Sequence, residues 1–299
     1  CFEEERIGCS MSKPKNDTAN ARPKRKKTAL IIAIVLLLVA LVAAGVLVFR
    51  YWSQQNAYQE LETYVEVEED PNVVKLSDLS ADWDALRKIN PDIVGWIYIP
   101  DSKINYPVVQ GPDNSKYLNT AFNGSDGWFS SAGTIFIDVK NAPDFTDRNT
   151  FLYGHHMRDG SMFAALTDWE NDKEFNEHRD IYILTPEGNY YAKSFSLLKT
   201  NGSEPIVVTQ FASDETYQDY IQKMLNRSMV NQEGDVFTAD MIKQSFALCT
   251  CEYTRNDGRD LLFATVIATT VPNDPFVSCD PDAITGLGKD QSVTFGTDE

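Results

Sequence analysis

The chain has 299 residues, of which 42% are hydrophobic and 24% are charged, with a formal net charge of −17 and five cysteines. This acidic balance argues against a nucleic-acid-binding protein, because the phosphate backbone requires a basic partner. Five cysteines in a chain of this length also exclude a disulfide-stapled scaffold, so the thiols are either chemical groups or incidental residues.

The N-terminal part predicts a membrane anchor. Residues 29–49 form an unbroken run of 21 uncharged, mostly aliphatic residues, and about 20 such residues span a bilayer. A dense basic cluster at 22–27 precedes the run, while Arg50, Tyr51 and Trp52 follow it. Because positive charge stays on the cytoplasmic side, we expect residues 1–28 in the cytoplasm and the chain after Trp52 outside the cell membrane.

Two other interpretations of the apolar run are weaker. Val42-Ala43-Ala44 resembles a cleavage site, but the run exceeds the roughly 7–15 residues of a signal-peptide core and continues past that point. A buried core helix is disfavoured because no polar face appears at a helical period. The charge divides at the same place, with a net charge of +4 over residues 1–28 and −22 over residues 51–299. We expect translation to begin at Met11, since a polar and basic segment follows it.

The segment after the anchor predicts a stalk and a short helix. Residues 50–79 are rich in Gln and Glu and predict a linker that is helical near 58–64. Ser80 is expected to cap a helix that carries Trp83 and Leu86 on one face and ends at Asn90 before a proline.

From Gly95 onward the pattern changes to short strands. Each is rich in β-branched or aromatic residues and is bounded by Gly, Pro, Asp or Asn. The predicted strands are 96–99, 104–109, 133–137, 150–153, 180–184, 190–198, 205–211, 245–251 and 261–268. Residues 186–189 form a hairpin turn between two of them. About eight short strands with regular turns favour a mainly β protein with a closed barrel.

Two helical segments interrupt the strands. Ser161 is expected to cap a helix over 162–167, and Ser213 a longer helix with apolar residues spaced for one face. The last residues turn polar and predict a disordered tail. The expected organisation is a cytoplasmic segment 1–28, a transmembrane anchor 29–49, a stalk 50–79, a catalytic domain 80–272 and a tail 273–299.

Three residues in the strand region carry the chemistry of amide cleavage. Cys251 ends an apolar run and is the candidate nucleophile, since a free thiol is the strongest nucleophile in the chain. His155 is the candidate acid and base, and Arg259 the candidate to favour the thiolate and hold an oxyanion. Each residue alone is weak evidence for catalysis. A single cysteine in a strand, for example, is usually a buried hydrophobic residue.

The surrounding motifs resemble class B sortases. Residues 153–163 read YGHHMRDGSMF and are similar to the Y-G-H-x-M-x-D-G-x-M-F block of that family. Leu248-Cys249-Thr250-Cys251, followed eight residues later by Arg259, is similar to its T-L-S-T-C block and following Arg. The segments 89–97, 104–111 and 133–138 also fit, so the resemblance covers roughly Ser80 to Thr270.

This resemblance implies a membrane-anchored cysteine transpeptidase with an eight-stranded sortase barrel, peripheral helices and no cofactor. Cys251 would cleave an NPxT[GN] or SPxTG-like sorting motif after Thr in a secreted protein. His155 would protonate the leaving amine and Arg259 would hold substrate and oxyanion. A peptidoglycan or precursor amine of the Gram-positive cell wall would then accept the thioacyl group. Cys249, Thr250 and Glu252 are expected to contact the substrate.

Two positions depart from the family pattern. Residue 247 is Ala and residue 249 is Cys, where the family usually shows Thr and Ser. Residues two apart in a strand share a face, so Cys249 is expected toward the same groove as Cys251. A redox pair of these two thiols is one hypothesis, but a simple Ser-to-Cys replacement is favoured because so short a loop strains a disulfide.

Several alternatives remain. A cysteine hydrolase of the papain or cell-wall peptidase type, which would cleave without transfer, is disfavoured by chain order. Those families typically place the nucleophilic Cys before the His, whereas here His155 precedes Cys251 by 96 residues. A metal site of two histidines and two cysteines does not match zinc spacing. A catalytically silent surface scaffold stays open. The family pattern selects His155 over His156 for proton transfer, and His178 is expected at the surface.

Overall fold

The computed structural model describes residues 23–67, 74–125, 132–252, 258–285 and 287, without the side chains at 23–29, 51, 53–57, 251 and 252. Two compact units are present, Cys1–Ser53 and Gln54–Glu299. Helix α1 (Pro23–Glu62) includes the apolar segment Leu30–Arg50, which has a mean hydropathy of 3.3 and is long enough to cross a membrane. The helix predicted over 29–49 is therefore confirmed as a helix.

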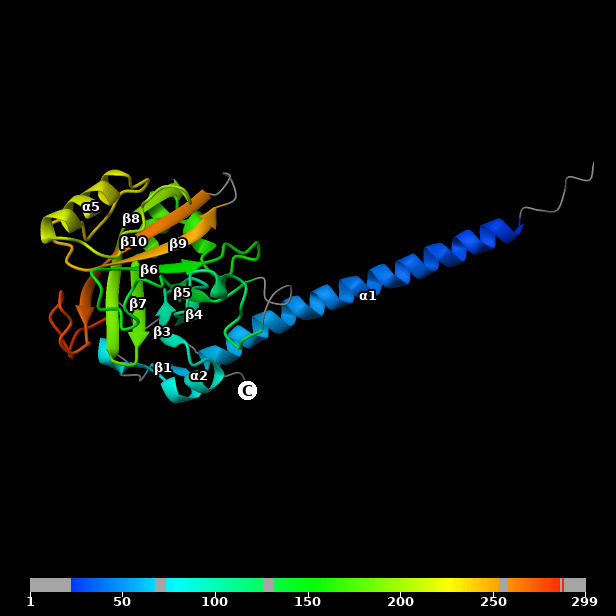
Figure 1. Cartoon of the computed structure of the whole chain (residues 1–299), viewed down its shortest axis with the longest axis horizontal. Coiled ribbons are helices and arrows are strands. Elements are labelled where there is room, and N and C mark those ends of the chain that lie inside the picture. Colours follow the sequence, from blue (N-terminus) through cyan, green and yellow to red (C-terminus); the bar gives the residue numbers. More distant parts are fainter. Residues whose placement is uncertain (1–22, 68–73, 126–131, 253–257, 286, 288–299) are drawn as a thin grey trace, which may run out of the picture. The chain divides into compact units, whose positions relative to one another are not determined.

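The second unit is built on a closed eight-stranded barrel, as the strand pattern predicted (Figure 1). The barrel strands are β3 (Ile93–Tyr98), β4 (Asn105–Val109), β5 (Ile135–Ile137), β6 (Asn149–Gly154), β7 (Asp180–Thr185), β8 (Gly188–Asn201), β9 (Ser245–Glu252) and β10 (Gly258–Thr269). They pair in the order β10-β8-β7-β3-β4-β5-β6-β9, with β9 closing onto β10. Two pairs are parallel, β4 with β5 and β6 with β9, and the others are antiparallel.

Strand β9 contains the continuous apolar stretch 246–249, because both faces of the strand are buried over residues 245–250. Phe246 and Leu248 belong to the main hydrophobic cluster, whereas Ala247 and Cys249 belong to another cluster, together with Phe151. This second cluster is covered by helix α5 (Asp214–Asn226), which buries Tyr217, Ile221 and Met224. Ser213 caps α5 by accepting a hydrogen bond from the Thr216 backbone, which confirms the predicted cap.

The segment expected to be a separate stalk is partly built into the second unit. Leu61 at the end of α1 is buried, as are Val65 in strand β1 (Val65–Val67) and Leu76 in the 3₁₀ helix η1 (Leu76–Asp78). Strand β1 pairs with β2 (Leu79–Ala81) in a small two-stranded sheet. The apolar residues among the Glu and Gln side chains therefore pull this segment onto the barrel, and a boundary at residue 80 does not describe it.

Three local predictions differ from the structure. Helix α2 (Trp83–Ile89) is capped by Asp82, whose carboxylate accepts from the Ala85 backbone, because Ser80 is occupied in β2. Residues 205–211 form no strand, since a closed barrel leaves no edge for another one. The helix predicted at 162–167 is instead α3 (Ala165–Asp168), and Ser161 bonds Asp159 in the preceding turn.

The segment after residue 272 also differs from its prediction as far as the structure describes it. The isolated bridge between Lys75 and Ile284 and the buried side chains of Ala283 and Leu287 hold it on the second unit. Polar composition alone predicted disorder, but these few apolar residues provide the contacts that order the segment. The expected tail beyond 287 lies outside the described residues.

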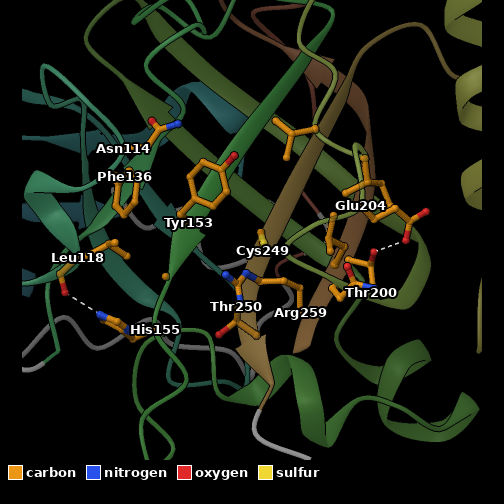
Figure 2. A pocket seen from close by; sticks show the side chains of 16 residues that line it. Asn114, Leu118, Phe136, Tyr153, His155, Thr200, Glu204, Cys249, Thr250 and Arg259 are labelled. Carbon is orange, nitrogen blue, oxygen red and sulfur yellow. Dashed lines mark hydrogen bonds between the residues drawn. The ribbon is translucent and has the colours of Figure 1, made fainter. Parts of the chain in front are cut away.

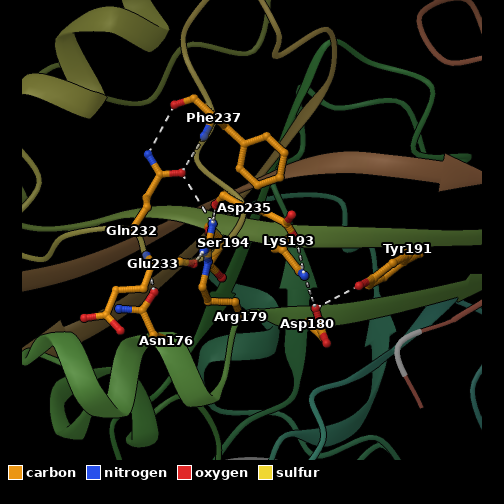
Figure 3. A network of polar contacts seen from close by, with 10 residues as sticks. All are labelled: Asn176, Arg179, Asp180, Tyr191, Lys193, Ser194, Gln232, Glu233, Asp235 and Phe237. Atoms are coloured by element: carbon orange, nitrogen blue, oxygen red, sulfur yellow. Dashed lines mark hydrogen bonds and ion pairs between the residues drawn. The ribbon is translucent and has the colours of Figure 1, made fainter. Parts of the chain in front are cut away.

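A buried arginine stabilises the segment that follows α5 (Figure 3). Arg179 lies just after helix α4 (Asp172–Glu177) and donates to the carbonyl oxygens of Ser194, Glu233 and Asp235 at 2.6–2.8 Å. Burial lowers the pKa of Arg179, while the nearby Asp235 carboxylate opposes that shift.

His178, expected at the surface, stacks on Trp169 with ring centroids 4.9 Å apart and is half-buried.

One carboxylate at the end of α1 makes folding stability depend on pH. Burial raises the pKa of Glu62 from 4.5 to about 7. The folded protein therefore holds this proton more tightly than the unfolded chain, so the stabilising effect is complete below about pH 4.5 and is lost as pH rises through 7.

We expect Glu62→Gln to stabilise the protein relative to wild type at pH 8 and to make little difference near pH 4.5. The gain should reach about 1–2 kcal/mol, because one pKa unit corresponds to about 1.4 kcal/mol and partial exposure screens part of the effect. Urea unfolding of the unit Gln54–Glu299 at both pH values measures it. Glu60→Gln, at an exposed position of the same helix, is the control. Equal pH dependence in Glu62→Gln and wild type would contradict the assignment.

Candidate active site

A cavity of about 420 Å³ opens on the outer face of the barrel over β6, β9 and β10 (Figure 2). The residues that line it include His155 at the end of β6, Cys249 and Thr250 on β9, and Arg259 on β10. It is larger than one side chain, and its walls combine apolar residues such as Phe136 and Leu261 with polar and charged side chains, as ligand sites do.

Strand register brings the three predicted catalytic positions together. Gly154 lies opposite Thr250 in the parallel pair of β6 and β9, so His155 and Cys251 follow at adjoining strand ends. Arg259 lies directly opposite Cys251 in the antiparallel pair of β9 and β10. Positions 155, 251 and 259 therefore stand side by side on neighbouring strands. The side chains of Cys251 and Glu252 lie outside the described residues.

The hydrogen bond of His155 fixes which ring nitrogen is available for proton transfer. His155 Nε2 lies 2.6 Å from the carbonyl oxygen of Leu118. A carbonyl oxygen only accepts, so Nε2 must carry the hydrogen. In the neutral ring, Nδ1 then has the free electron pair and is the nitrogen that can accept a proton.

Arg259 keeps its guanidinium at the cavity and donates from one terminal nitrogen to the Gly258 carbonyl at 3.0 Å. A planar guanidinium offers five N–H donors in a fixed fork and stays charged at any working pH. The group can therefore orient a carbonyl and neutralise an oxyanion while one donor remains bonded to the backbone.

Two of the three residues expected to contact substrate can be placed. The thiol-bearing residue Cys249 is 6% exposed and lines the cavity next to Tyr153. The Thr250 hydroxyl is buried and has no hydrogen-bond partner among the residues that the structure describes. Both are thus cavity residues, while nothing is described of the Glu252 side chain.

The structure adds cavity residues that the sequence did not single out. At one end, the Tyr153 hydroxyl and the Asn114 amide both donate to Asp138, at 2.8 and 2.9 Å. At the other end, Glu204 accepts from Thr200 and from Arg227. The hydrogen bonds from Arg227 and Thr200 lower the pKa of Glu204, so this carboxylate is ionised. The polar run 200–204 after a predicted strand was the available signal for the second end.

His156 has a different environment from His155. Its Nδ1 lies 3.0 Å from the Thr167 hydroxyl, which donates at 2.7 Å to the buried carboxylate of Asp260. The structure therefore brings His155, and not His156, to the cavity wall. No three His, Cys, Asp or Glu side chains gather as metal ligands would within the described part of the chain.

Comparison with known proteins places this fold and cavity in one family. A sortase-domain family model matches residues 97–267. Sortase B of Staphylococcus aureus is 31% identical over 258 residues, which is 81% of this chain and 98% of that protein. Sortase B of Listeria monocytogenes is 34% identical over 167 residues, which is 56% of this chain and 65% of that protein.

A solved structure agrees with these matches. The Staphylococcus aureus sortase B–substrate complex superposes with a TM-score of 0.61 at 29% identity, over 73% of this chain and 98% of that chain. The family model, the sequence identity over most of the chain and the superposed fold all indicate the same family. The chain belongs to the sortase family, as a class B sortase and cysteine transpeptidase.

Proposed function

We propose that Cys251 is the nucleophile, His155 the acid and base, and Arg259 the oxyanion and substrate-binding residue of this transpeptidase. The observation that carries the proposal is the strand register, with Gly154 opposite Thr250 and Arg259 opposite Cys251. Positions 155, 251 and 259 thus lie on adjoining strands, and the side chains of His155 and Arg259 line the cavity.

In the first half-reaction, the thiolate sulfur of Cys251 adds to the carbonyl carbon of Thr in the sorting motif. Arg259 donates to the resulting oxyanion, whose charge is otherwise costly in a partly buried site. Collapse breaks the carbon–nitrogen bond, and the leaving amine takes a proton from His155 Nδ1, the nitrogen left over by the bond to Leu118. The product is a thioester on Cys251 and a released C-terminal fragment.

In the second half-reaction, an amine attacks the thioester carbonyl while neutral His155 accepts its proton. The carbon–sulfur bond breaks, the thiolate is restored and a new amide is formed. We propose a peptidoglycan or precursor amine as the acceptor and secreted proteins with NPxT[GN] or SPxTG-like motifs as the substrates. The cavity between the Asp138 end and the Glu204 end would hold the motif.

We further propose that residues 29–49 anchor the enzyme as a single-pass segment with the N-terminus in the cytoplasm and the barrel outside the cell. The basic cluster at 22–27 and the aromatic pair Tyr51-Trp52 flank the apolar helix, as expected for this orientation. Protease treatment of intact cells should remove an epitope tag placed after residue 287 but should leave a tag placed at Met11. The opposite pattern would reverse the orientation.

The transferase activity is tested with quenched-fluorescent peptides that carry NPxTG, NPxTN or SPxTG, with and without an added oligoglycine amine. We expect cleavage after Thr and, with amine present, a ligated product in place of the free acid. Equal amounts of free acid under both conditions would identify a hydrolase without transfer. No cleavage of any peptide, despite a folded protein, would identify a silent scaffold.

A further inference from the structure

We propose that Tyr58, in the last turns of helix α1, positions His155 for catalysis. This inference rests on the proposed role of His155. Tyr58 lies in the second compact unit, which begins at Gln54, on the same helix as the apolar segment. Two sets of contacts connect its side chain with the two sides of His155, its ring nitrogen and its backbone.

The first set leads to the hydrogen bond of the imidazole. The Tyr58 hydroxyl donates to the Gly133 carbonyl at 2.6 Å. Gly133 has φ +59° and lies so close to the preceding loop that a Cβ there would be 2.4 Å from the Tyr117 oxygen and 2.6 Å from the Leu118 oxygen. That Leu118 oxygen is the acceptor for His155 Nε2. Tyr58 therefore fixes the backbone that packs against the acceptor of the catalytic imidazole.

A neighbouring residue joins the same two segments. The Thr134 backbone donates to the Tyr117 carbonyl at 3.0 Å, and its hydroxyl donates to the Thr120 carbonyl at 2.8 Å. Residues 133–134 and 117–120 thus form one hydrogen-bonded unit, which Tyr58 ties to α1. A shift of Gly133 would be passed to Leu118, because the two backbones are already in contact.

The second set of contacts leads to the backbone of His155. The Tyr58 ring packs edge-on against Tyr106, with centroids 5.6 Å apart at 84°. The Tyr106 hydroxyl accepts from the Met162 backbone at 3.1 Å, and the next residue, Phe163, donates to the His155 carbonyl at 2.9 Å. The turn that follows His155 is therefore held through Tyr106, whose ring packs against Tyr58.

The environment of Tyr58 suits a permanent donor. Burial raises the pKa of its hydroxyl to about 12, against the opposing hydrogen bonds of Thr134 and Phe122. The group thus stays protonated over the pH range in which the enzyme works. The bond from Tyr58 to Gly133 is partly buried, and Leu61, three residues further along α1, is buried, so access of water to this bond is limited.

The decisive variant is Tyr58→Phe in the full chain in detergent micelles, since it removes the hydroxyl and keeps the ring on Tyr106. Loss of one buried hydrogen bond should lower kcat about fivefold to tenfold, with KM within about twofold. Tyr64→Phe is the control, because Tyr64 is also a partly buried tyrosine, lies two residues after α1, and its hydroxyl makes no hydrogen bond among the described residues. Its kcat should equal that of wild type.

A spectroscopic readout separates positioning from general destabilisation. The chain has three histidines, so nitrogen-15 spectra of the imidazoles can be assigned with His156→Gln and His178→Gln. In wild type, His155 should show the Nε2–H tautomer, and in Tyr58→Phe a mixture of tautomers, at a temperature well below unfolding. Gly133→Ala, whose Cβ would lie 2.6 Å from the Leu118 oxygen, should shift the same resonance.

Wild-type kcat and an unchanged His155 tautomer in Tyr58→Phe would overturn the positioning role. A fall in kcat that follows the melting temperature alone, with the His155 resonance unchanged, would also overturn it. The proposed function stands or falls separately, because it fails only if wild type itself does not cleave and ligate the peptides.

Discussion

Cys251→Ala abolishes cleavage and transfer of every sorting-motif peptide, with an expected loss of at least about 1,000-fold, because no other group replaces the attacking sulfur. The strand register supports this expectation, since position 251 faces Arg259 across the β9–β10 pair and adjoins His155 across the β6–β9 pair. The measurement is kcat/KM with a quenched-fluorescent peptide, alongside the melting temperature to show that the variant is folded.

Cys279→Ala is the matched control for loss of a thiol. Cys279 is exposed and donates to the Thr270 carbonyl, away from the residues that line the cavity. Its activity should equal that of wild type. Full activity in Cys251→Ala would remove Cys251 as the nucleophile and point to the neighbouring thiol of Cys249.

Arg259→Lys is the second large effect that we expect, with kcat/KM reduced by about 100-fold or more, the scale seen when one oxyanion donor is lost. Lysine keeps the positive charge but not the planar fork, so it cannot donate to Gly258 and to an oxyanion in the same geometry. The loss should appear mainly in kcat, because the oxyanion develops only in the transition state.

Arg87→Lys gives the corresponding control at the surface. Arg87 lies on α2, is half-exposed and forms a 4.0 Å ion pair with Asp84. This exchange should leave kcat/KM unchanged. Turnover of Arg259→Lys at the wild-type rate would refute the oxyanion role and leave Arg259 as a general source of positive potential.

Much of the fold could be predicted from the sequence because its signals are local. The apolar stretch 246–249 specifies the strand β9, and the Pro-Glu-Gly sequence specifies the turn between β7 and β8, each within a few residues. Ser213 specifies the start of α5 in the same way. Closure of about eight such strands into a barrel follows from the need to bury both faces and leave no edge.

The arrangement of the active site was harder to predict from the sequence. Pairing of β6 with β9 joins residues 96 positions apart, and no local pattern encodes their register. The partner of His155 is a backbone carbonyl at Leu118, and backbone atoms leave no signature in the residue type. The sequence could therefore nominate His155, Cys251 and Arg259 through resemblance, but it could not identify Leu118, Gly133 or Tyr58 as their support.

The predictions for residues 205–211 and 50–79 were wrong because tertiary contacts, which local composition does not show, decide where these segments lie. Residues 205–211 have the composition of a strand, yet Ile206 packs under α5 and lines the cavity because the barrel is already closed. The segment 50–79 reads as polar, yet Leu61 and Val65 bury themselves in the second unit. Average composition hides the few apolar residues that decide where a segment lies.

Mapping the acyl group on the intact enzyme tests the identity of the nucleophile most directly. The full chain is incubated with excess sorting peptide without an amine, quenched in acid, and its mass measured before fragmentation of the tryptic peptide 244–255, which contains Cys249 and Cys251. We expect a gain equal to the N-terminal fragment of the peptide less one water, located on Cys251. An adduct on Cys249, or continued cleavage with no adduct on either thiol, would contradict Cys251 as the nucleophile.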